Sequence, residues 1–82
     1  MGYYCYILKS DNFSKHYYGS CKDKAKRLAR HNSGKVRSTK AYRPWKIIYS
    51  EEFKTRAEAY NRELFFKSAE GKKYLRQLSI IS

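Results

Sequence analysis

Two tyrosine-rich segments near the N-terminus constrain the fold of this chain most. Residues 3–10 (YYCYILKS) and 15–20 (KHYYGS) are rich in residue types that favour β-strands. The residues between them, 11–14 (DNFS), are mostly types that favour turns. We therefore predict an antiparallel β-hairpin at the start of the chain.

The hairpin also predicts which side chains share a face. If Ser10 lies opposite Lys15, then Leu8 lies opposite Tyr17. Because side chains alternate along a strand, Tyr6 is then a diagonal neighbour of Tyr17 on the same face. The two phenol groups are expected to project together, either as cross-strand packing or as part of a site.

A short, strongly basic helix is predicted over residues 23–33. Asp23 is a suitable N-cap, and Gly34 follows where a left-handed residue often ends a helix. The stripe expected to pack inward consists of Ala25, Leu28 and Ala29.

Two more helices are predicted in the last third of the chain. Thr55 followed by Glu58 is a capping-box pattern and opens a helix over residues 55–69. Gly71 is expected to break the helical pattern, and residues 72–78 to form a final short helix. The side chains expected to pack inward are Ala57, Tyr60, Leu64, Phe65, Leu75 and Leu78.

The middle of the chain supplies a loop and a third strand. Residues 33–44 are polar and cationic without a period, which indicates a loop, and residues 45–50 (WKIIYS) resemble a buried strand that residues 51–53 carry outward. The predicted order is β-β-α-β-α-α, in one α/β (α+β) domain spanning residues 1–82.

Composition limits the classes of protein that this chain can belong to. The 82 residues carry 19 Lys and Arg against 7 Asp and Glu, a formal net charge of +12, but the many aromatic residues exclude a disordered basic tail. Cys5 and Cys21 with two histidines are too few ligands for a zinc finger, so we expect idle thiols. No segment resembles a membrane span or secretory signal, which predicts a soluble, cytoplasmic protein.

The positive charge is concentrated in one segment. Residues 24–50 contain no acid, and such a basic stretch is typical of a phosphate-binding surface. Nucleic acid is the first candidate partner and an acidic membrane surface the second, while a merely solvated basic face is the alternative. The side chains expected to contact nucleic acid are Lys24, Lys26, Arg30, Lys35, Arg37, Lys40 and Arg43.

The basic helix also carries two candidate catalytic groups. Arg27 and His31 are four residues apart and therefore lie on one face of a helix. A guanidinium and an imidazole near the phenols of the hairpin could act together on a phosphate group. The alternative for His31 is a cation interacting with the dipole at the helix C-terminus.

Five short motifs occur in an order typical of a known family. They are YCYIL at 4–8, YYGS at 17–20, KRLARHN at 26–32, RP at 43–44 and EAYNRE at 58–63. Together they resemble the GIY-YIG nuclease domain, and most closely its small single-domain members, similar to the N-terminal domain of the excision-repair incision subunit. The resemblance extends over residues 3–75.

The resemblance implies a three-stranded antiparallel sheet flanked by helices and a metal-dependent centre for phosphodiester hydrolysis. Tyr6 would be the general base or its partner, and Tyr17 would orient water or phosphate. Arg27 would hold the phosphate, and His31 would assist the tyrosine. Glu63 would be the carboxylate ligand of one Mg²⁺ or Mn²⁺.

Two of these implied roles have physical consequences. A free phenol has a pKa near 10, so Tyr6 needs help to ionise, and we expect Arg27, the metal and His31 to favour its phenolate. One glutamate suffices for Mg²⁺ that also binds substrate phosphate and water. The alternative for Glu63 is an ordinary i,i+4 ion pair with Lys67.

The chain also departs from the usual family pattern. Tyr4 takes the place of the leading glycine, Tyr18 that of an aliphatic residue, and no asparagine follows Asn61. No segment is available for a separate DNA-recognition domain.

Three functional hypotheses follow. The first is a Mg²⁺-dependent endonuclease, monomeric or weakly dimeric, that acts on DNA rather than RNA, on a particular structure in repair or recombination. The second is a nucleic-acid-binding module of the same fold with weak or no catalysis. The third is a small basic protein that packs on a larger complex through its tyrosine-rich face.

Overall fold

The computed structural model describes residues 2–82. The elements are β1 (Tyr3–Ser10), β2 (His16–Cys21), α1 (Lys24–Asn32), a 3₁₀ turn η1 (Lys40–Tyr42), β3 (Trp45–Phe53), α2 (Arg56–Lys67) and α3 (Ala69–Gln77). The predicted order of strands and helices is confirmed, with η1 as an addition inside the predicted loop. No helix among the described residues is both long enough and apolar enough to span a membrane.

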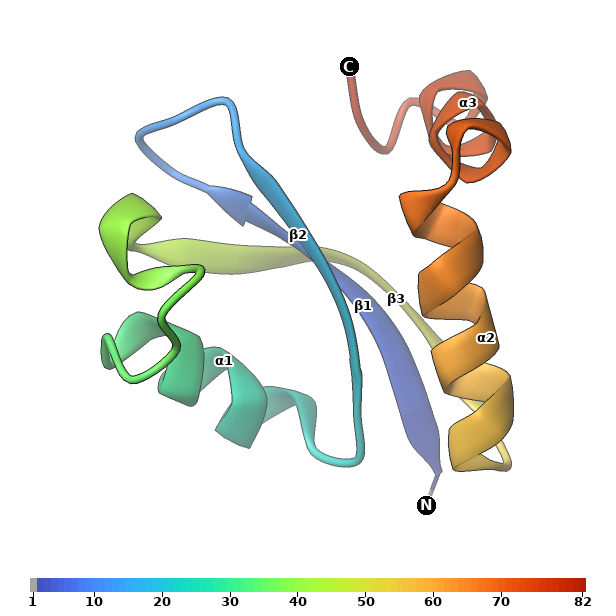
Figure 1. Cartoon of the computed structure of the whole chain (residues 1–82), viewed down its shortest axis with the longest axis horizontal. Coiled ribbons are helices and arrows are strands. Elements are labelled where there is room, and N and C mark those ends of the chain that lie inside the picture. Colours follow the sequence, from blue (N-terminus) through green and yellow to red (C-terminus); the bar gives the residue numbers. More distant parts are fainter. Residues whose placement is uncertain (1) are drawn as a thin grey trace.

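The three strands form one antiparallel sheet in the order β2-β1-β3, with β1 in the centre. Leu8 lies opposite Tyr17, as the hairpin pattern predicts, and Tyr6 lies opposite Gly19. In Figure 1, β2 crosses in front of the other strands, α1 lies on one side of the sheet, and α2 and α3 lie on the other. The edge strand β2 therefore runs between the two groups of helices.

Alternation along β1 supplies a core to each face of the sheet. The core on the side of α2 and α3 contains Cys5, Ile7, Phe66 and Leu75. The core on the side of α1 contains Tyr6, Leu8, Cys21 and Trp45, with Leu28 packed against them. Both cysteines are free and buried, as expected of idle thiols.

The helix starts follow the predicted caps. The Asp23 side chain accepts a hydrogen bond from the Lys26 amide, and Gly34 has a φ of 83° just beyond α1. At α2 both bonds of the capping box between Thr55 and Glu58 are present. Such caps satisfy amide groups that a helix leaves unpaired at its N-terminus, so these boundaries were readable from local sequence.

Of the predicted stripe of α1, only Leu28 packs inward. Ala25 and Ala29 are exposed, and the helix turns Leu28 and His31 inward. Alanine buries little apolar area, so the larger Leu28 and the hydrogen-bonded His31 decide how the helix is oriented.

Of the predicted stripe of α2, only Phe65 packs against the core, and Ala57 is exposed. Tyr60 and Leu64 are 50% and 45% exposed, whereas Ala59, Glu63 and Phe66 face the sheet. Apolar side chains occur around most of this helix, so hydrophobic spacing alone does not select a face. In α3 Leu75 is buried as predicted, but Leu78 is exposed.

Gly71 does not break the last helix. α2 ends at Lys67, and Ser68 caps both the end of α2 and the start of α3, which contains Gly71 in its first turn. A Cβ atom at Gly71 would lie 1.8 Å from the carbonyl oxygen of Phe65. The glycine is therefore needed because the two helices approach closely.

We predict that Gly71→Ala destabilises the protein, although alanine is the better helix former. The added methyl group has no space against backbone, and overpacking of this kind typically costs about 1–3 kcal/mol. In a domain of this size each kcal/mol lowers the thermal midpoint by roughly 4–8 °C. The exposed Lys73→Ala is the control and should change stability by less than about 0.5 kcal/mol. Equal midpoints for the two variants would contradict the close approach.

Candidate active site

Tyr6 reaches from the central strand to the edge strand. Its side chain is 1% exposed, and a Cβ atom on the opposing Gly19 would lie 2.5 Å from the Tyr6 phenol oxygen. The ring therefore crosses the space that a larger side chain on β2 would fill. The available sequence signal was a glycine inside an otherwise β-rich segment, which often marks a close approach.

The phenol of Tyr6 begins a chain of buried hydrogen bonds. Its oxygen lies 3.1 Å from Nε2 of His31, and Nδ1 of His31 lies 2.9 Å from Oγ1 of Thr39. Thr39 in turn donates to the carbonyl oxygen of Val36 at 3.4 Å. A carbonyl can only accept, so Thr39 accepts from Nδ1–H and leaves Nε2 free to accept from Tyr6.

His31 is therefore a buried, neutral imidazole. It is 1% exposed, and its pKa is lowered from the ordinary histidine value by burial and by the nearby charges of Arg27 and Arg30. The alternative of a charged histidine at the helix C-terminus does not hold, since the side chain faces the core rather than solvent.

The loop after α1 holds this histidine in place. Thr39 is buried, and its carbonyl oxygen accepts from Nε1 of Trp45 at 2.8 Å. The Asn32 side chain bonds to both the amide and the carbonyl of Trp45. The sequence did not point to Thr39, because no local pattern in a polar loop marks one threonine as buried.

Tyr17 and Arg27 complete this side of the site. The Tyr17 ring centroid lies 4.7 Å from that of His31 and 6.4 Å from that of Tyr6. The charge of Arg27 acts on both Tyr6 and His31. The four side chains that the sequence suggested for catalysis are thus brought together.

Arg27 favours the ionised form of Tyr6, as expected, but burial outweighs its effect in the free protein. Burial, the largest effect, and the neighbouring Tyr17 raise the pKa of Tyr6 above that of a free phenol, although Arg27 acts in the opposite direction. Without a ligand Tyr6 is therefore a neutral phenol at pH 7. Its value as a base depends on the imidazole to which it is hydrogen-bonded.

Glu63 approaches the edge strand from the other face of the sheet. It is 9% exposed, and its Oε1 accepts from Oγ of Ser20 at 2.8 Å. Its Oε2 forms an ion pair with Nζ of Lys67 at 2.8 Å, which raises the pKa of Lys67. The i,i+4 ion pair between Glu63 and Lys67 is therefore present. The Glu63 carboxylate is, however, also buried and hydrogen-bonded to Ser20 of β2.

The donor set around Glu63 suits a single, weakly held divalent cation. Among residues 2–82 no group of three or more His, Cys, Asp or Glu side chains is placed to bind a metal. One carboxylate with substrate phosphate and water is a common arrangement for Mg²⁺. The Glu63 carboxylate already binds one cation, the Lys67 ammonium. It therefore fits the role of metal ligand.

The predicted nucleic-acid contacts fall into two groups of three residues, with Lys24 separate from both. Lys26, Arg30 and Lys35 line shallow hollows along α1. Lys24 lies apart, since its ammonium sits 4.5 Å from the Tyr4 ring centroid and donates to Ser50. Three further cations, Arg37, Lys40 and Arg43, are exposed in the loop before β3.

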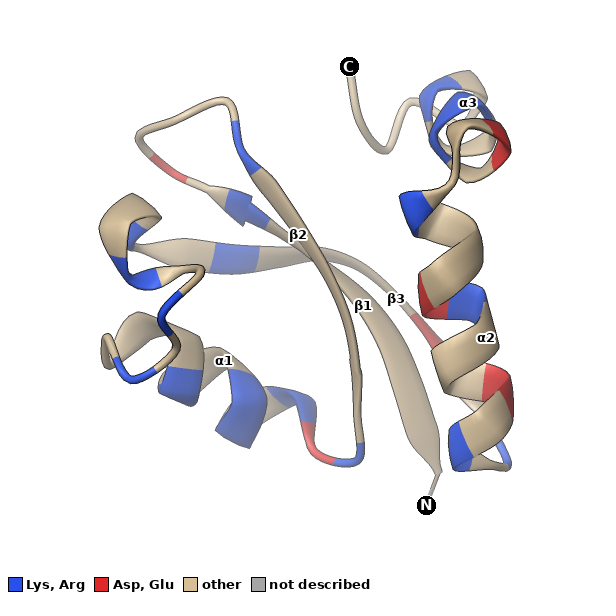
Figure 2. Cartoon of the chain, viewed as in Figure 1, with Lys and Arg blue, Asp and Glu red and all other residues tan. Residues whose placement is uncertain are grey.

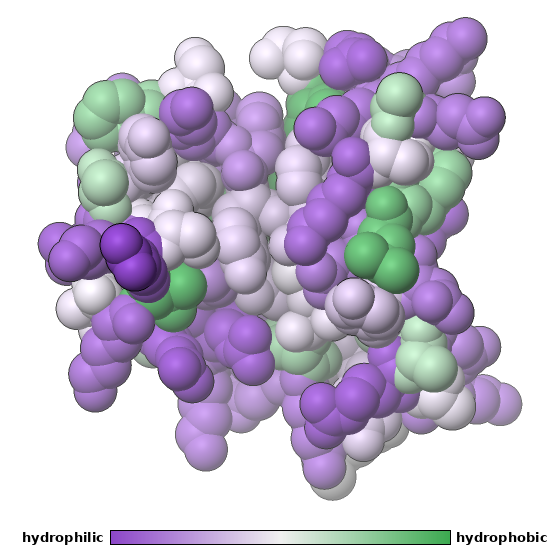
Figure 3. All heavy atoms as spheres, in the orientation of Figure 1, coloured by the Kyte–Doolittle hydropathy of each residue, from purple (hydrophilic) through white to green (hydrophobic). Residues whose placement is uncertain are grey.

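The figures show how charge and hydropathy are distributed around the site. After the start of α1, all charged residues of the helix and the following loop are basic (Figure 2). Most acids lie on β3, α2 and α3. The space-filling view shows a pale strip over β2, with hydrophilic atoms beside it over α1 (Figure 3). The candidate site therefore lies between a basic and a mixed-charge wall.

Comparisons with known proteins show the family to which the chain is related. Residues 2–75 match the family described as the GIY-YIG catalytic domain. A UPF0213 protein of Staphylococcus saprophyticus is 38% identical over 78 residues, which cover 94% of both chains. The UPF0213 protein YazA of Bacillus subtilis is 38% identical over 87% of this chain and 72% of its own. The solution NMR structure of a UPF0213 protein from Bacillus halodurans matches with a TM-score of 0.54 and 30% identity, over 95% of this chain and 85% of that one.

We predict that His31 makes stability fall in acid. Because its folded pKa is lowered, the unfolded state binds the proton more readily, so stability is full above about pH 6.5 and decreases as the pH falls below it. The stability difference between wild type and His31→Gln should therefore shrink from about pH 7.5 to about pH 5. His16→Gln, at the half-exposed histidine, is the control and should change less. A constant difference for His31→Gln in thermal unfolding would contradict a neutral, buried imidazole.

Proposed function

The chain belongs to the GIY-YIG catalytic-domain family, together with the small UPF0213 proteins, and from this we propose that it is a divalent-metal-dependent endonuclease that hydrolyses DNA. The observation that supports the proposal most is the meeting of Tyr6, Tyr17, Arg27 and His31 on one side of β2 with the buried Glu63 on the other.

Tyr6 and His31 would share the work of activating water. A water proton passes to the Tyr6 oxygen while the Tyr6 proton passes to Nε2 of His31, which is free to accept it. This relay avoids a free phenolate, which the raised pKa of Tyr6 makes unfavourable. Thr39 keeps the correct tautomer by accepting from Nδ1.

Arg27 and Tyr17 would act on the phosphate. Among residues 2–82 Arg27 makes no ion pair with a carboxylate, so its guanidinium is free to neutralise charge that builds up on the phosphate oxygens. The Tyr17 phenol, whose ring lies next to that of His31, would orient the attacking water.

Glu63 would hold the metal ion, with Ser20 fixing the direction of its carboxylate. A bound Mg²⁺ or Mn²⁺ would supply a positive charge that polarises the phosphate and stabilises the leaving oxygen. Lys67 must then yield part of its contact with Oε2.

A DNA-binding module with little catalysis is the second candidate. Two observations favour this second candidate. Lys67 pairs with the carboxylate that would bind the metal, and the raised pKa of Tyr6 keeps its phenol neutral, so the centre is inactive in the absence of a ligand. Tight, salt-sensitive binding of an oligonucleotide without metal-dependent turnover would distinguish this candidate from the enzyme.

The remaining parts of the proposal concern the substrate and the assembly. We propose that the whole chain, residues 1–82, acts as one catalytic domain, as a monomer or weak dimer. DNA is proposed over RNA, and a branched, flapped or nicked structure over a fixed sequence, because shape can be recognised through phosphate contacts alone. A role in repair or recombination in the cytoplasm would follow.

We predict that purified protein nicks supercoiled plasmid only when Mg²⁺ or Mn²⁺ is present. Glu63→Gln, Arg27→Ala and Tyr6→Phe should each lower the rate by about 100-fold or more, since each removes a group that stabilises the transition state or transfers a proton. Glu52→Gln and Arg76→Ala, both exposed, are matched controls and should cut like wild type. Equal nicking by all variants would reveal a contaminating nuclease and refute the proposal.

We also predict that Lys67→Met strengthens metal binding. Lys67 competes with a cation for Oε2 of Glu63, and a half-exposed ion pair is worth about 0.5–1 kcal/mol, so Mn²⁺ affinity should rise about 2–5-fold. Titration of free Mn²⁺ by electron paramagnetic resonance measures this without any cleavage. Lys73→Met is the control on α3, and an unchanged affinity for Lys67→Met would argue against Glu63 as the ligand.

A further inference from the structure

A small cavity next to the candidate site is lined by three cations that the catalytic proposal does not explain together. The cavity has a volume of about 160 Å³, and its lining includes Tyr3, Ser20, Lys22, Arg27, Arg56 and Ala59. Ser20 is the hydrogen-bond donor to Glu63, and Ala59 lies one helical turn before Glu63. Among the residues that the structure describes, no acidic side chain lines this cavity.

The charges around this cavity are unbalanced. The ion pairs among residues 2–82 join Lys46 to Asp11, Arg62 to Glu51 and Lys67 to Glu63. Lys22, Arg27 and Arg56 therefore face a common space without a carboxylate partner in the described part of the chain. An anion in the cavity would relieve their mutual repulsion.

Arg56 is in an unusual place for a cation. It is the first residue of α2, where the positive end of the helix dipole disfavours positive charge. Its guanidinium lies 5.3 Å from the Tyr3 ring centroid, a contact that orients the exposed side chain beside the cavity. Local helix stability does not explain this residue, whereas an anion bound nearby does.

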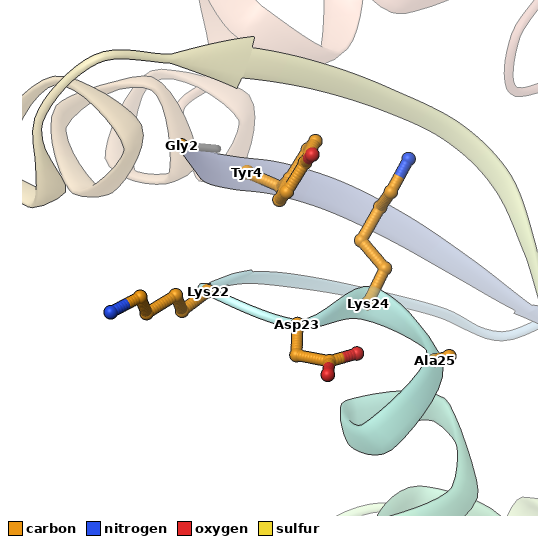
Figure 4. Close-up of a pocket in the computed structure, with 6 residues that line it drawn as sticks. All are labelled: Gly2, Tyr4, Lys22, Asp23, Lys24 and Ala25. Carbon is orange, nitrogen blue, oxygen red and sulfur yellow. The ribbon is translucent and has the colours of Figure 1, made fainter.

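Lys22 and Lys24 differ in what they contact. Figure 4 shows Lys24 directed alongside Tyr4, whereas Lys22 projects away from both. The hollow of about 320 Å³ beside Tyr4 is larger than the cavity but contains none of the catalytic candidates. Because the Lys24 charge is already engaged with Tyr4 and Ser50, Lys22 is the lysine available to the cavity.

The cavity continues into the hollows along α1. It shares Lys22 and Arg27 with a hollow of about 360 Å³ that also contains Lys26, Arg30 and one acid, the N-cap residue Asp23. That hollow shares Lys26 and Arg30 with another of about 570 Å³ that reaches Lys35. We call this continuous row of cations, Lys22, Lys26, Arg27, Arg30 and Lys35, the basic track.

We propose that Lys22 and Arg56, together with Arg27, form a second phosphate-binding subsite that takes a backbone phosphate neighbouring the cleaved bond on the same strand. This inference rests on the proposed nuclease function and adds the direction in which the strand leaves the centre, along the basic track. Arg56 lies about 10 Å before Glu63 along the helix axis, which limits the subsite to a phosphate within about three linkages of the cut. Arginine suits this position because its planar fork matches phosphate oxygens.

The first test maps the neighbouring phosphate by cleavage. Oligonucleotides carry one uncharged methylphosphonate at each linkage in turn, and the cut position on a sequencing gel fixes the register. In wild type, cleavage should fall about tenfold when the methylphosphonate lies at one offset, within about three linkages of the cut. Arg56→Ala should cleave unmodified DNA more slowly, and a methylphosphonate at that offset should not lower its rate further. Arg56→Lys should regain part of the sensitivity to the methylphosphonate. Equal sensitivity in wild type and Arg56→Ala would overturn the proposal.

The second test does not need cleavage, so it separates failure of the subsite from failure of the nuclease proposal. Oligonucleotide affinity is measured in EDTA at several salt concentrations. The slope of log affinity against log salt should be smaller in magnitude by about 0.7–0.9 in Arg56→Ala, which is the value of one phosphate contact. Arg76→Ala on α3 is the control and should keep the wild-type slope. An unchanged slope in Arg56→Ala would overturn the subsite even if the protein cuts DNA.

A terminal phosphate is the other possible source of the same anion. Oligonucleotides with a 5′-phosphate and with a 5′-hydroxyl should bind wild type equally if the subsite takes internal phosphates. A preference for the 5′-phosphate that disappears in Arg56→Ala would overturn the proposal in favour of a strand-end site.

Discussion

The close approach of the Tyr6 ring to Gly19 is the contact on which the rest of the site depends. The missing side chain on the edge strand lets a residue of the central strand extend as far as β2. Only from there can its phenol meet His31, and His31 can be buried there only because Thr39 satisfies its other nitrogen. One glycine thus connects the sheet, α1 and the loop before β3.

The site forms around an edge strand because its parts come from opposite faces of the sheet. Tyr6, His31 and Arg27 lie on the side of α1, whereas Glu63 reaches Ser20 from α2. This arrangement keeps the basic wall apart from the carboxylate, so Arg27 is not neutralised by Glu63 in the free protein. Most of the basic side chains are exposed, so water and counter-ions can screen the repulsion that a net charge of +12 creates.

The sequence predicted correctly those features that depend on residues close together along the chain. The hairpin register, the Asp23 cap and the capping box involve residues close along the chain, and all three are confirmed. The orientation of α2 and the role of Gly71 depend on contacts between elements, and both predictions were wrong.

The candidate site shows the same division. The motifs predicted that Tyr6, Tyr17, Arg27 and His31 lie close together, and they do. Thr39 was missed, and the raising effect of burial on the Tyr6 pKa was not anticipated, because burial depends on the whole fold. Spacing along a helix could not show that Glu63 points inward to β2.

The central claim is that Glu63 and the tyrosines form one metal-assisted centre around β2. The most direct measurement is paramagnetic broadening of backbone amide signals in the NMR spectrum when Mn²⁺ is added with a short oligonucleotide at low temperature. Our account predicts that broadening centres on Glu63, Ser20 and Gly19, extends to Arg27, and disappears in Glu63→Gln. Broadening centred on another acid such as Glu52 or Glu70, with the signals of β2 unaffected, would contradict it.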